Sequence, residues 1–434
     1  MKRILLTAGL AAISLIYVFG ATTSAEPNST IAAVKILNVR QFGAKGDGNT
    51  LDTAAIQKAL DECGKSGNGI VRIPAGTYLS KPIFLKSNTT LELEQGAILK
   101  ATDDPNDFVN EDKKSNDPLA FINGIDLTKI AITGKGTIDG SGAKWWPPVR
   151  EAKKNDQPEP RKRPRLIVLN NCVGVHIKDI TLTNSPSFHL FPIGCKNVDI
   201  VHVTIRAPQD SPNTDAIDIA QCRYVQISDC VIDVGDDNIA ITANHQDSAH
   251  PNAGSQYITV TNCTNLHGHG ISIGSGTRGG VKDLTVSHCT FENTDNGIRI
   301  KSSREKGGLC ENLTYSDITM KNVKEPITLS AYYPKIPKED TAQPVTSTTP
   351  IYKNIRITNV TATSPKNAGY IVGLPESLVE NVVLENVRIS APVGLTIRNA
   401  KGIKLKNVKI ETPQGKEPFI LENAQVEGLE QTSK

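Results

Sequence analysis

The chain has 434 residues, of which 38% are hydrophobic, and its 48 basic and 45 acidic residues give a formal net charge of +3. So small a charge excludes a global basic field of the kind that draws a protein to nucleic acid or to a membrane surface. The length exceeds the roughly 250–300 residues at which one compact core stops growing. No Pro/Ser-rich linker divides the chain, so an extended single domain is the simplest organisation.

The first 25 residues have the pattern of a secretory signal peptide. Lys2 and Arg3 precede an apolar run over residues 4–20, and small residues at 23–25 offer a cleavage site before Glu26. The run is short for a membrane span, and no other candidate span follows it. We expect cleavage to leave residues 26–434 as a secreted or periplasmic, monomeric domain with no membrane or nucleic-acid partner.

Residues 51–63 predict a short helix. Asp52 is the expected N-cap, apolar residues follow at helical spacing, and Gly64 is the expected stop. A single amphipathic helix ahead of a long repeat is suited to cover the open end of that repeat.

The rest of the chain repeats the pattern apolar-x-apolar-x-x-apolar-x-apolar every 21 to 42 residues. Copies begin at Val175, Val198, Val225, Leu284, Leu313, Val382 and Ile403, with a weaker copy at Ile355. Length varies only in polar, Gly- and Asn-rich intervals, which indicates coils of constant cross-section with loops of variable length. Leucine-rich repeats are the competing solenoid, but their period is fixed and Leu-dominated. We predict an all-β, single-domain, right-handed parallel β-helix with a short N-terminal capping helix.

Four polar motifs occur in order along this repeat, each next to or overlapping an Ile-x-Ile strand. They are Asn213-Thr214-Asp215, Asp236-Asp237, Gly268-His269-Gly270 and Arg299-Ile300-Lys301. Successive strand side chains point to opposite sides, so Asp236, Arg299 and Lys301 are predicted to face outward.

The other three motif side chains have the opposite parity. Asp215, Asp237 and His269 lie in phase with the buried isoleucines, so they reach the outer face only if the backbone bends before each strand. The glycines on both sides of His269 permit such a conformation. The sequence thus permits a bend before each of these strands but does not require one.

The chemistry of glycoside hydrolysis explains why three aspartates would converge. One carboxylic acid protonates the leaving oxygen and a carboxylate activates water. Carboxylates at close range raise one another's proton affinity, which lets them divide these roles. Turn formation is the alternative explanation of such aspartates, but their joint spacing favours a site. Arg299 and Lys301 suit a substrate carboxylate, with a solvated face as the alternative.

The eight cysteines allow up to four disulfides in an exported protein. Six of them instead occupy repeat positions that fit small, buried, stacked hydrophobes: Cys172, Cys195, Cys222, Cys230, Cys263 and Cys289. We favour stacked thiols and keep disulfides as the alternative, while Cys63 and Cys310 have no assignment. No Cys-x-x-Cys or His-x-x-x-His spacing appears, so we expect no metal and no other cofactor.

The chain resembles glycoside hydrolase family 28, the polygalacturonase family, across nearly all of residues 26–434. Supporting segments lie at 42–48, 73–78 and 136–140, followed by Trp145-Trp146 and by Asn184-Ser185-Pro186. The Gly-rich opening segments occur in other pectin-active β-helices as well. The four ordered motifs are the specific part of the resemblance.

The resemblance implies inverting hydrolysis of α-1,4-galacturonosidic bonds in polygalacturonate or pectin. Asp236 would be the general acid, with Asp215 and Asp237 orienting and activating water. His269 would help to hold the proton state of the acid. Asn238 follows the aspartate pair where the family often has Cys, and because it is not the acid we expect the chemistry to survive.

Substrate-binding roles also follow from the resemblance. Arg299 and Lys301 would bind a substrate carboxylate, and Tyr333 aligns approximately with a substrate-contacting tyrosine of the family, with Tyr332 as an alternative. Asn213 would orient Asp215 or a sugar hydroxyl, with turn formation as the alternative. The basic run at 161–165 and the nearby His189 are further candidates, for which a solvated loop is equally compatible.

Three other functions remain open at this point. A pectate lyase depends on Ca²⁺ and an arginine base, and no acidic cluster separate from the motifs is evident. Rhamnogalacturonan-cleaving relatives depart from the Asn-Thr-Asp and Gly-His-Gly motifs. A noncatalytic polysaccharide-binding solenoid is the third. Attack within the polymer or at its end depends on the loops at 244–256 and 332–352, whose conformation the sequence does not give.

Overall fold

The computed structural model describes residues 34–112, 116–244 and 253–429, so the predicted signal peptide lies outside the described residues. Lys35–Lys434 form one compact unit, distinct from Met1–Val34. Among the described residues no helix is long and apolar enough to cross a membrane.

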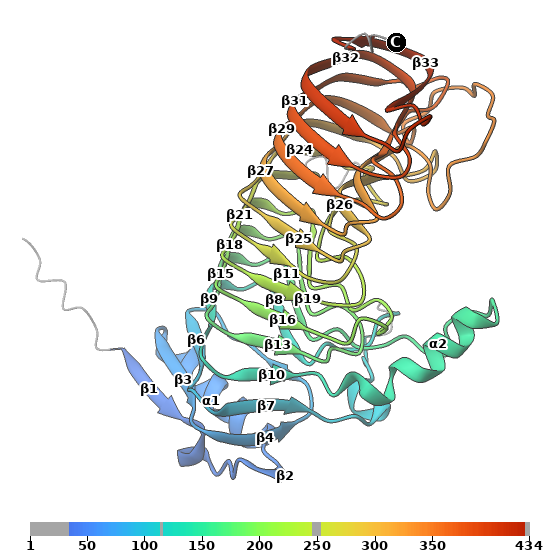
Figure 1. The fold of residues 1–434 in the computed structure, drawn as a ribbon. Helices are drawn as coiled ribbons and strands as arrows, with labels where there is room; N and C mark the ends of the chain where they lie inside the picture. The colour runs from blue at the N-terminus through green and yellow to red at the C-terminus, as the bar shows by residue number, and fades with distance from the viewer. Residues whose placement is uncertain (1–33, 113–115, 245–252, 430–434) are drawn as a thin grey trace, which may run out of the picture. The chain divides into compact units, whose positions relative to one another are not determined.

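Parallel strands stack coil upon coil along this unit and form three faces, which we call sheets 1, 2 and 3 (Figure 1). Sheet 1 contains β5 (Ile83–Phe84), β8 (Ile122–Ile125), β11 (Ile167–Asn170), β14 (Leu190–Ile193), β17 (Ile217–Ala220), β20 (Ile239–Thr242), β23 (Ile271–Ile273), β26 (Asn296–Lys301), β28 (Glu325–Ser330) and β30 (Gly369–Val372). Sheet 2 contains β1 (Lys35–Asn38), β3 (Gly69–Ile73), β6 (Thr89–Leu93), β9 (Thr128–Gly134), β12 (Val173–Lys178), β15 (Lys196–Val201), β18 (Arg223–Ser228), β21 (Ser255–Thr261) and β24 (Val281–Ser287).

Sheet 3 and the last coils complete the solenoid. Sheet 3 contains β2 (Asp47–Leu51), β4 (Gly76–Ser80), β7 (Ala97–Ala101), β10 (Thr137–Asp139), β13 (Thr181–Thr183), β16 (Thr204–Arg206), β19 (Val231–Asp233), β22 (Thr264–Asn265) and β25 (Thr290–Glu292). The final strands are β27 (Leu309–Lys321), β29 (Ile351–Thr363), β31 (Val379–Ser390), β32 (Leu395–Glu411) and β33 (Phe419–Glu427). Several of these are long and cross a corner, as β27 does in pairing with both β24 and β25.

Coil-to-coil register stacks the predicted apolar pairs in the interior. Ile217 pairs with Ile239, which pairs with Ile271, which in turn pairs with Ile298. All four side chains are buried, as β-branched residues facing one another across a pleated sheet should be. The parallel β-helix predicted from the repeat is confirmed.

Helix α1 (Thr53–Ser66) confirms the predicted N-terminal helix and its N-cap position but corrects its C-terminal end. It buries apolar residues such as Ile56 and Leu60 against the first coils. Asp52 occupies the N-cap position, yet its carboxylate accepts hydrogen bonds from the backbone of the preceding loop and none from the helix. The predicted stop at Gly64 is wrong, because Gly67, in a left-handed conformation, ends the helix. Gly64 serves packing instead, since a Cβ there would lie 2.7 Å from Lys86 Cβ.

Shorter helices lie outside the β-coils. They are α2 (Trp146–Lys154), which projects from the side of the solenoid in Figure 1, and the 3₁₀ helices η1 (Val39–Phe42), η2 (Pro105–Phe108) and η3 (Gly142–Lys144). The sequence analysis missed all of these.

All eight cysteines are buried free thiols. The backbone N–H of Cys172 donates to Sγ of Cys195 at 3.4 Å, and that of Cys195 donates to Sγ of Cys222 at 3.3 Å. The stacked-thiol interpretation is therefore confirmed for Cys172, Cys195 and Cys222, and the disulfide alternative is wrong.

A row of left-handed residues turns the chain near the start of successive strands, in sheet 2 and in the long strands β27, β29 and β31. After Lys129 on β9 (φ +52°) and Gly174 on β12, this corner row consists of Asn197, Tyr224, Tyr257, Asp283, Asn312, Asn354 and Asn381, with φ between +54° and +59°. Asparagine and aspartate tolerate this conformation because their short side chains bond locally. They also bond between coils, as Asn312 does by donating to Asp283 Oδ1 at 3.0 Å.

Candidate active site

The four motifs lie on neighbouring coils of sheet 1. The outward side chain between each isoleucine pair falls in one row, in which Asp218, Ala240, Ser272 and Arg299 are register partners on β17, β20, β23 and β26. Register partners on adjacent strands are far apart in sequence, yet only one strand spacing, about 4.8 Å, separates them. The sheet itself gathers the motif residues.

The bends that the sequence permitted occur before β20 and β23. The backbone bends at Gly235, Asp236 and Asn238, immediately before β20 begins at Ile239, so strict alternation does not apply to the two aspartates. Before β23, both glycines around His269 have positive φ, of +115° at Gly268 and +73° at Gly270. A Cβ on Gly268 would lie 2.4 Å from Asp236 O, so glycine is also required for the close approach of the two loops.

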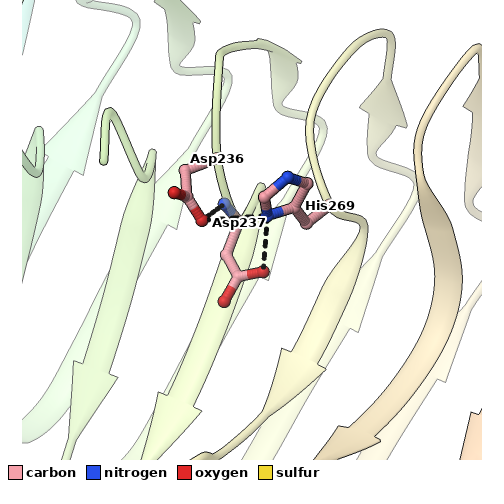
Figure 2. Close-up of side chains that lie close together, drawn as sticks. All are labelled: Asp236, Asp237 and His269. Atoms are coloured by element: carbon pink, nitrogen blue, oxygen red, sulfur yellow. Dashed lines mark hydrogen bonds and ion pairs between the residues drawn. The ribbon is translucent and has the colours of Figure 1, made fainter. Parts of the chain in front are cut away.

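Asp236 and His269 form the centre of the cluster (Figure 2). His269 Nδ1 lies 3.0 Å from Asp236 Oδ1, and its Nε2 lies 3.7 Å from Asp295. Asn213 donates to Asp236 Oδ2 at 3.5 Å. The side chains of Asp236 and His269 are both partly exposed to solvent, so a ligand bound on the outer face of sheet 1 can reach them.

The two central groups perturb each other's protonation. Burial alone raises the pKa of Asp236, but the hydrogen bond from His269 and the charges of His269 and Lys301 outweigh it and hold that pKa below its usual range. Burial likewise lowers the pKa of His269, yet Asp236 and Asp237 outweigh burial and raise it. Both shifts favour an ion pair in which the imidazolium of His269 holds the proton and Asp236 is ionised.

Asp237 is held by cations and a hydroxyl. Lys301 Nζ donates to Asp237 Oδ2 at 2.8 Å, Arg299 Nη1 donates to Oδ1 at 3.2 Å, and Ser272 Oγ donates to Oδ1 at 2.9 Å. The Asp237 side chain is only 5% exposed, so these partners compensate a buried charge. Tyr333 completes this side, with its ring centroid 5.4 Å from Lys301 Nζ and 6.0 Å from the Arg299 guanidinium.

Two further carboxyls are buried beside this cluster. Desolvation, together with the charges of Asp218, Asp236 and Asp237, raises the pKa of Asp215 well above its usual range. Desolvation and the charges of Asp237 and Asp236 do the same for Asp218. Asp215 Oδ1 and Asp218 Oδ2 have no hydrogen-bond partner among the described residues. Each of these two carboxyls is therefore driven toward its protonated form.

All eight predicted site residues are thus brought to one region, and the structure adds two that the sequence analysis did not assign. Asp218 was given no role, although its position between Ile217 and Ile219 gives its side chain outward parity. Asn238 bonds both flanks of His269, donating to His267 O and accepting from Gly270 N at 2.7 Å each. A single sequence gave no sign of that contact, because it depends on the folded loop.

The weaker candidates Arg163, Arg165 and Tyr332 differ in what their side chains contact. Arg163 is buried and donates to Asn213 Oδ1 at 2.9 Å as well as to two backbone carbonyls, so it supports the Asn213 loop. Arg165 stacks on Phe188 and Phe191 at the groove edge. Tyr332 turns to Asp340, to which its hydroxyl donates at 2.7 Å, so Tyr333 is the tyrosine at the cluster.

His189 is buried directly behind the cluster. Its backbone N–H donates to Asp215 O at 2.8 Å, and its Nδ1 lies 3.0 Å from the same oxygen. Burial lowers the pKa of His189 to about 4, so it is neutral at pH 7. His189 therefore fixes the backbone that carries Asp215 and presents no charge to the groove.

A hollow adjoins the cluster on each side. One of about 300 Å³ is lined by Arg163, Arg165 and Asn213. The other, of about 480 Å³, is lined by Arg299, Lys301 and Tyr333 and by residues of the following coils. The cluster thus lies between two hollows that both carry positive charge.

The donor atoms of Asp236, Asp237 and His269 lie within 4.8 Å of one another, close enough to hold a metal ion. Two protein cations already contact Asp237, and the imidazolium of His269 adds a third positive charge. A metal ion at this place would have to displace them, so the local charges disfavour it.

Comparison with known proteins agrees with this architecture. The family model "Glycosyl hydrolases family 28" matches residues 63–412. An endo-polygalacturonase of Pectobacterium carotovorum subsp. carotovorum is 30% identical over 407 residues, covering 89% of this chain and 96% of the relative.

Two solved structures extend the similarity to the fold. An exopolygalacturonase from Thermotoga maritima superposes with a TM-score of 0.76 at 25% identity, covering 87% of this chain and 92% of that one. A polygalacturonase from Erwinia carotovora ssp. carotovora gives a TM-score of 0.67 at 29% identity, covering 88% and 94%.

The protein is a β-helical glycoside hydrolase. It belongs to glycosyl hydrolase family 28. The family resemblance and the right-handed parallel β-helix inferred from the sequence are both confirmed.

The buried, unpaired carboxyl of Asp218 leads to a stability prediction. Because the pKa of Asp218 is raised in the folded state, ionisation of this carboxyl destabilises the fold once pH exceeds about 3.9, the pKa of an aspartate in the unfolded chain. Below that pH the destabilisation vanishes. Asp218→Asn should therefore stabilise the fold at pH 7 by about 1–3 kcal/mol, and by much less at pH 4. Denaturant unfolding at both pH values measures this. Asp236→Asn, which removes an ion-paired carboxylate, is the control that should show no such gain, and equal effects of Asp218→Asn at both pH values would contradict the argument.

Proposed function

We propose that the protein is a polygalacturonase that hydrolyses α-1,4-galacturonosidic bonds in polygalacturonate or pectin. The observation that carries the proposal is the contact of Asp236 with His269 at 3.0 Å, beside Asp237 and its two cations, between two positively charged hollows. Relatives that are named polygalacturonases support the substrate class.

Proton delivery is assigned to Asp236 as general acid. In the free protein the proton belongs to the pair that Asp236 forms with His269, because the pKa of the carboxyl is lowered and that of the imidazole is raised. A glycosidic oxygen bound at Asp236 would receive this proton as the bond breaks, and His269 would supply it across their 3.0 Å contact. Such a pair keeps a proton available at a pH where an isolated aspartate would have lost it.

Water activation is assigned to Asp215 and Asp237. Asp237, which contacts Arg299 and Lys301, would accept the proton of the water, while Asp215, whose raised pKa favours the protonated form, would donate a hydrogen bond that orients the water. Attack by a water held between them, on the side opposite the leaving oxygen, would invert the anomeric centre.

Recognition of the substrate carboxylate is assigned to Arg299 and Lys301. In the free protein both contact Asp237, so a galacturonate carboxylate would share these cations. Arg299 is the more accessible, with a side chain 17% exposed against 9% for Lys301. Arg299 is therefore proposed to meet the substrate carboxylate, and Lys301 mainly to hold Asp237. The ring of Tyr333 forms the adjoining wall, and Asn213 orients Asp236.

Lyase chemistry is the less favourable assignment for this cluster. A Ca²⁺-dependent lyase needs carboxylates free to ligate the cation, whereas Asp236 is paired with His269 and Asp237 with two cations. The hydrolase assignment requires no change in these ion pairs.

The first functional prediction concerns the acid. Asp236→Asn keeps the size of the side chain but removes the proton donor, so kcat should fall by about 10²–10⁴ on polygalacturonate. Reducing-end release measures this, with Asp233→Asn, an aspartate bonded to His267, as the matched control. The parent should work in excess chelator without forming unsaturated, ultraviolet-absorbing products. Near-normal activity of folded Asp236→Asn would refute the role, and chelator-abolished activity with unsaturated products would indicate a lyase.

A second prediction concerns pH. The raised pKa of His269 means that the pair keeps its proton until pH exceeds that value, so activity should decline on the alkaline side as the imidazolium titrates. His269→Gln should move the alkaline limb of kcat/KM to lower pH, because Asp236 must then hold the proton alone. The pH profile of kcat/KM is the measurement, and an unchanged alkaline limb in a folded variant would exclude His269 as the proton holder.

A third prediction separates charge recognition from support of the site. Arg299→Gln should lower kcat/KM on polygalacturonate about 10- to 150-fold, the effect of losing one charge-assisted contact of roughly 1.5–3 kcal/mol. The loss should be smaller on highly methyl-esterified pectin, which presents no carboxylate there. Arg356→Gln, at a surface pair with Glu385, is the control. Equal proportional losses on both substrates would mean that Arg299 only supports Asp237.

A further inference from the structure

Two tyrosines occupy corner-row positions where most neighbouring coils use Asn, Asp or Gly, and Lys129 is the other long side chain in the row. Tyr224 and Tyr257 have φ of +59° and +57°, while the neighbouring positions are Asn197 and Asp283. The left-handed backbone is unfavourable for a bulky side chain, so each tyrosine strains the coil where asparagine would not. Strain of this kind persists where a residue serves something other than folding.

The tyrosine rings are stacked and exposed. Their centroids are 5.0 Å apart with planes 9° from parallel, and the residues are 55% and 43% exposed. Asparagine pairs in the same row also bridge coils, as Asn381 does by donating to Asn354, so coil stacking does not require aromatic rings. The neighbouring positions of the row on either side of the pair carry the short side chains of Asn197 and Asp283.

Positive charge surrounds the tyrosine pair. Arg223 lies 5.9 Å from the Tyr257 ring centroid and donates to Gln256, and Lys196 is its register partner on the preceding coil. Neither cation has a carboxylate within 4 Å in the described part of the chain. The one carboxylate in the row, Asp283, is occupied by hydrogen bonds from Gln256 and Asn312.

Arg223 also lines a hollow of about 490 Å³ together with Gln256, Arg278 and Lys282. Lys282 is paired with Glu311 at 2.9 Å, whereas Arg278 donates to the backbone carbonyl of Glu305. The hollow lies past the C-terminal ends of β17, β20 and β23, whereas Asp215, Asp237 and His269 precede the N-terminal ends of the same strands. It is therefore a different surface from the candidate active site.

We propose that Tyr224, Tyr257 and Arg223, with this adjoining hollow, form a second binding surface for an acidic polysaccharide chain. A pyranose ring presents an apolar C–H face that packs against the outer face of a tyrosine ring. The carboxylate of a uronate residue would meet the planar guanidinium of Arg223. The uronate polymer is taken to be polygalacturonate, and this identification rests on the proposed function.

Two binding surfaces on one rigid solenoid would act together only on a long ligand. A polymer that reaches both gains avidity, because binding at one surface raises the effective concentration at the other. A short oligogalacturonate can fill only one surface at a time. The second surface should therefore increase binding to polymer and leave cleavage of short oligomers unchanged.

The test replaces the tyrosines with the residue that other coils use. In the Asp236→Asn background, which prevents digestion, affinity electrophoresis in polygalacturonate should show that Tyr224→Asn/Tyr257→Asn binds about tenfold more weakly, as expected for loss of one charged or stacked subsite. Arg223→Gln should have a similar effect on polygalacturonate and little on methyl-esterified pectin. Asn354→Gly, in the same row, is the control, and thermal unfolding should show that the tyrosine variants are at least as stable as the parent.

In the otherwise unmodified enzyme, the tyrosine variants should lose activity on long polymer but keep it on trigalacturonate. Unchanged polymer binding by the double tyrosine variant would overturn the proposal, as would equal losses on polymer and trigalacturonate. Equal losses for charged and methyl-esterified polymer with Arg223→Gln would overturn the assigned carboxylate contact. Failure of the parent enzyme to cleave any polygalacturonate would instead refute the proposed function, and the binding comparison would still report on this surface.

Discussion

Parallel register between successive coils is the constraint on which the site depends. Backbone hydrogen bonds fix Asp218, Ala240, Ser272 and Arg299 in one row, although the chain travels 81 residues between the first and the last. A one-residue slip would turn the buried isoleucines outward and the polar row inward, so burial of the core and assembly of the site are enforced by the same bonds. Loops between the strands can vary in length without disturbing either.

Charge compensation is the second constraint. Asp237 is buried among Lys301, Arg299 and Ser272, and Asp236 is paired with His269. The remaining carboxyls, Asp215 and Asp218, have no such cation at hydrogen-bond distance and are driven toward the protonated form. Asp215, Asp218 and Asp236 thus differ in proton affinity because their immediate partners differ, which is the condition for dividing acid and base roles among clustered carboxyls.

Supporting contacts of the motif side chains come mostly from loops. Asn238 bonds the backbone on either side of His269, Arg163 bonds Asn213, and His189 bonds the carbonyl of Asp215. These residues lie beside or behind the motif side chains and fix their positions. The sheet brings the motif coils together, while these loop contacts set the orientation of each functional group.

The sequence by itself determined the solenoid, its apolar rows and the identity of the motif residues, because strand periodicity and repeat length depend only on local order along the chain. It also indicated that the backbone must bend before the motif strands if Asp237 and His269 were to reach the outer face. Only the tertiary structure decided which partners each group acquires: the cations on Asp237, the solvent exclusion around Asp218, the end of α1 at Gly67, and the tyrosine pair in the corner row. Those contacts join residues one coil or more apart, and their distances depend on loop paths and burial, which no local pattern of residues specifies.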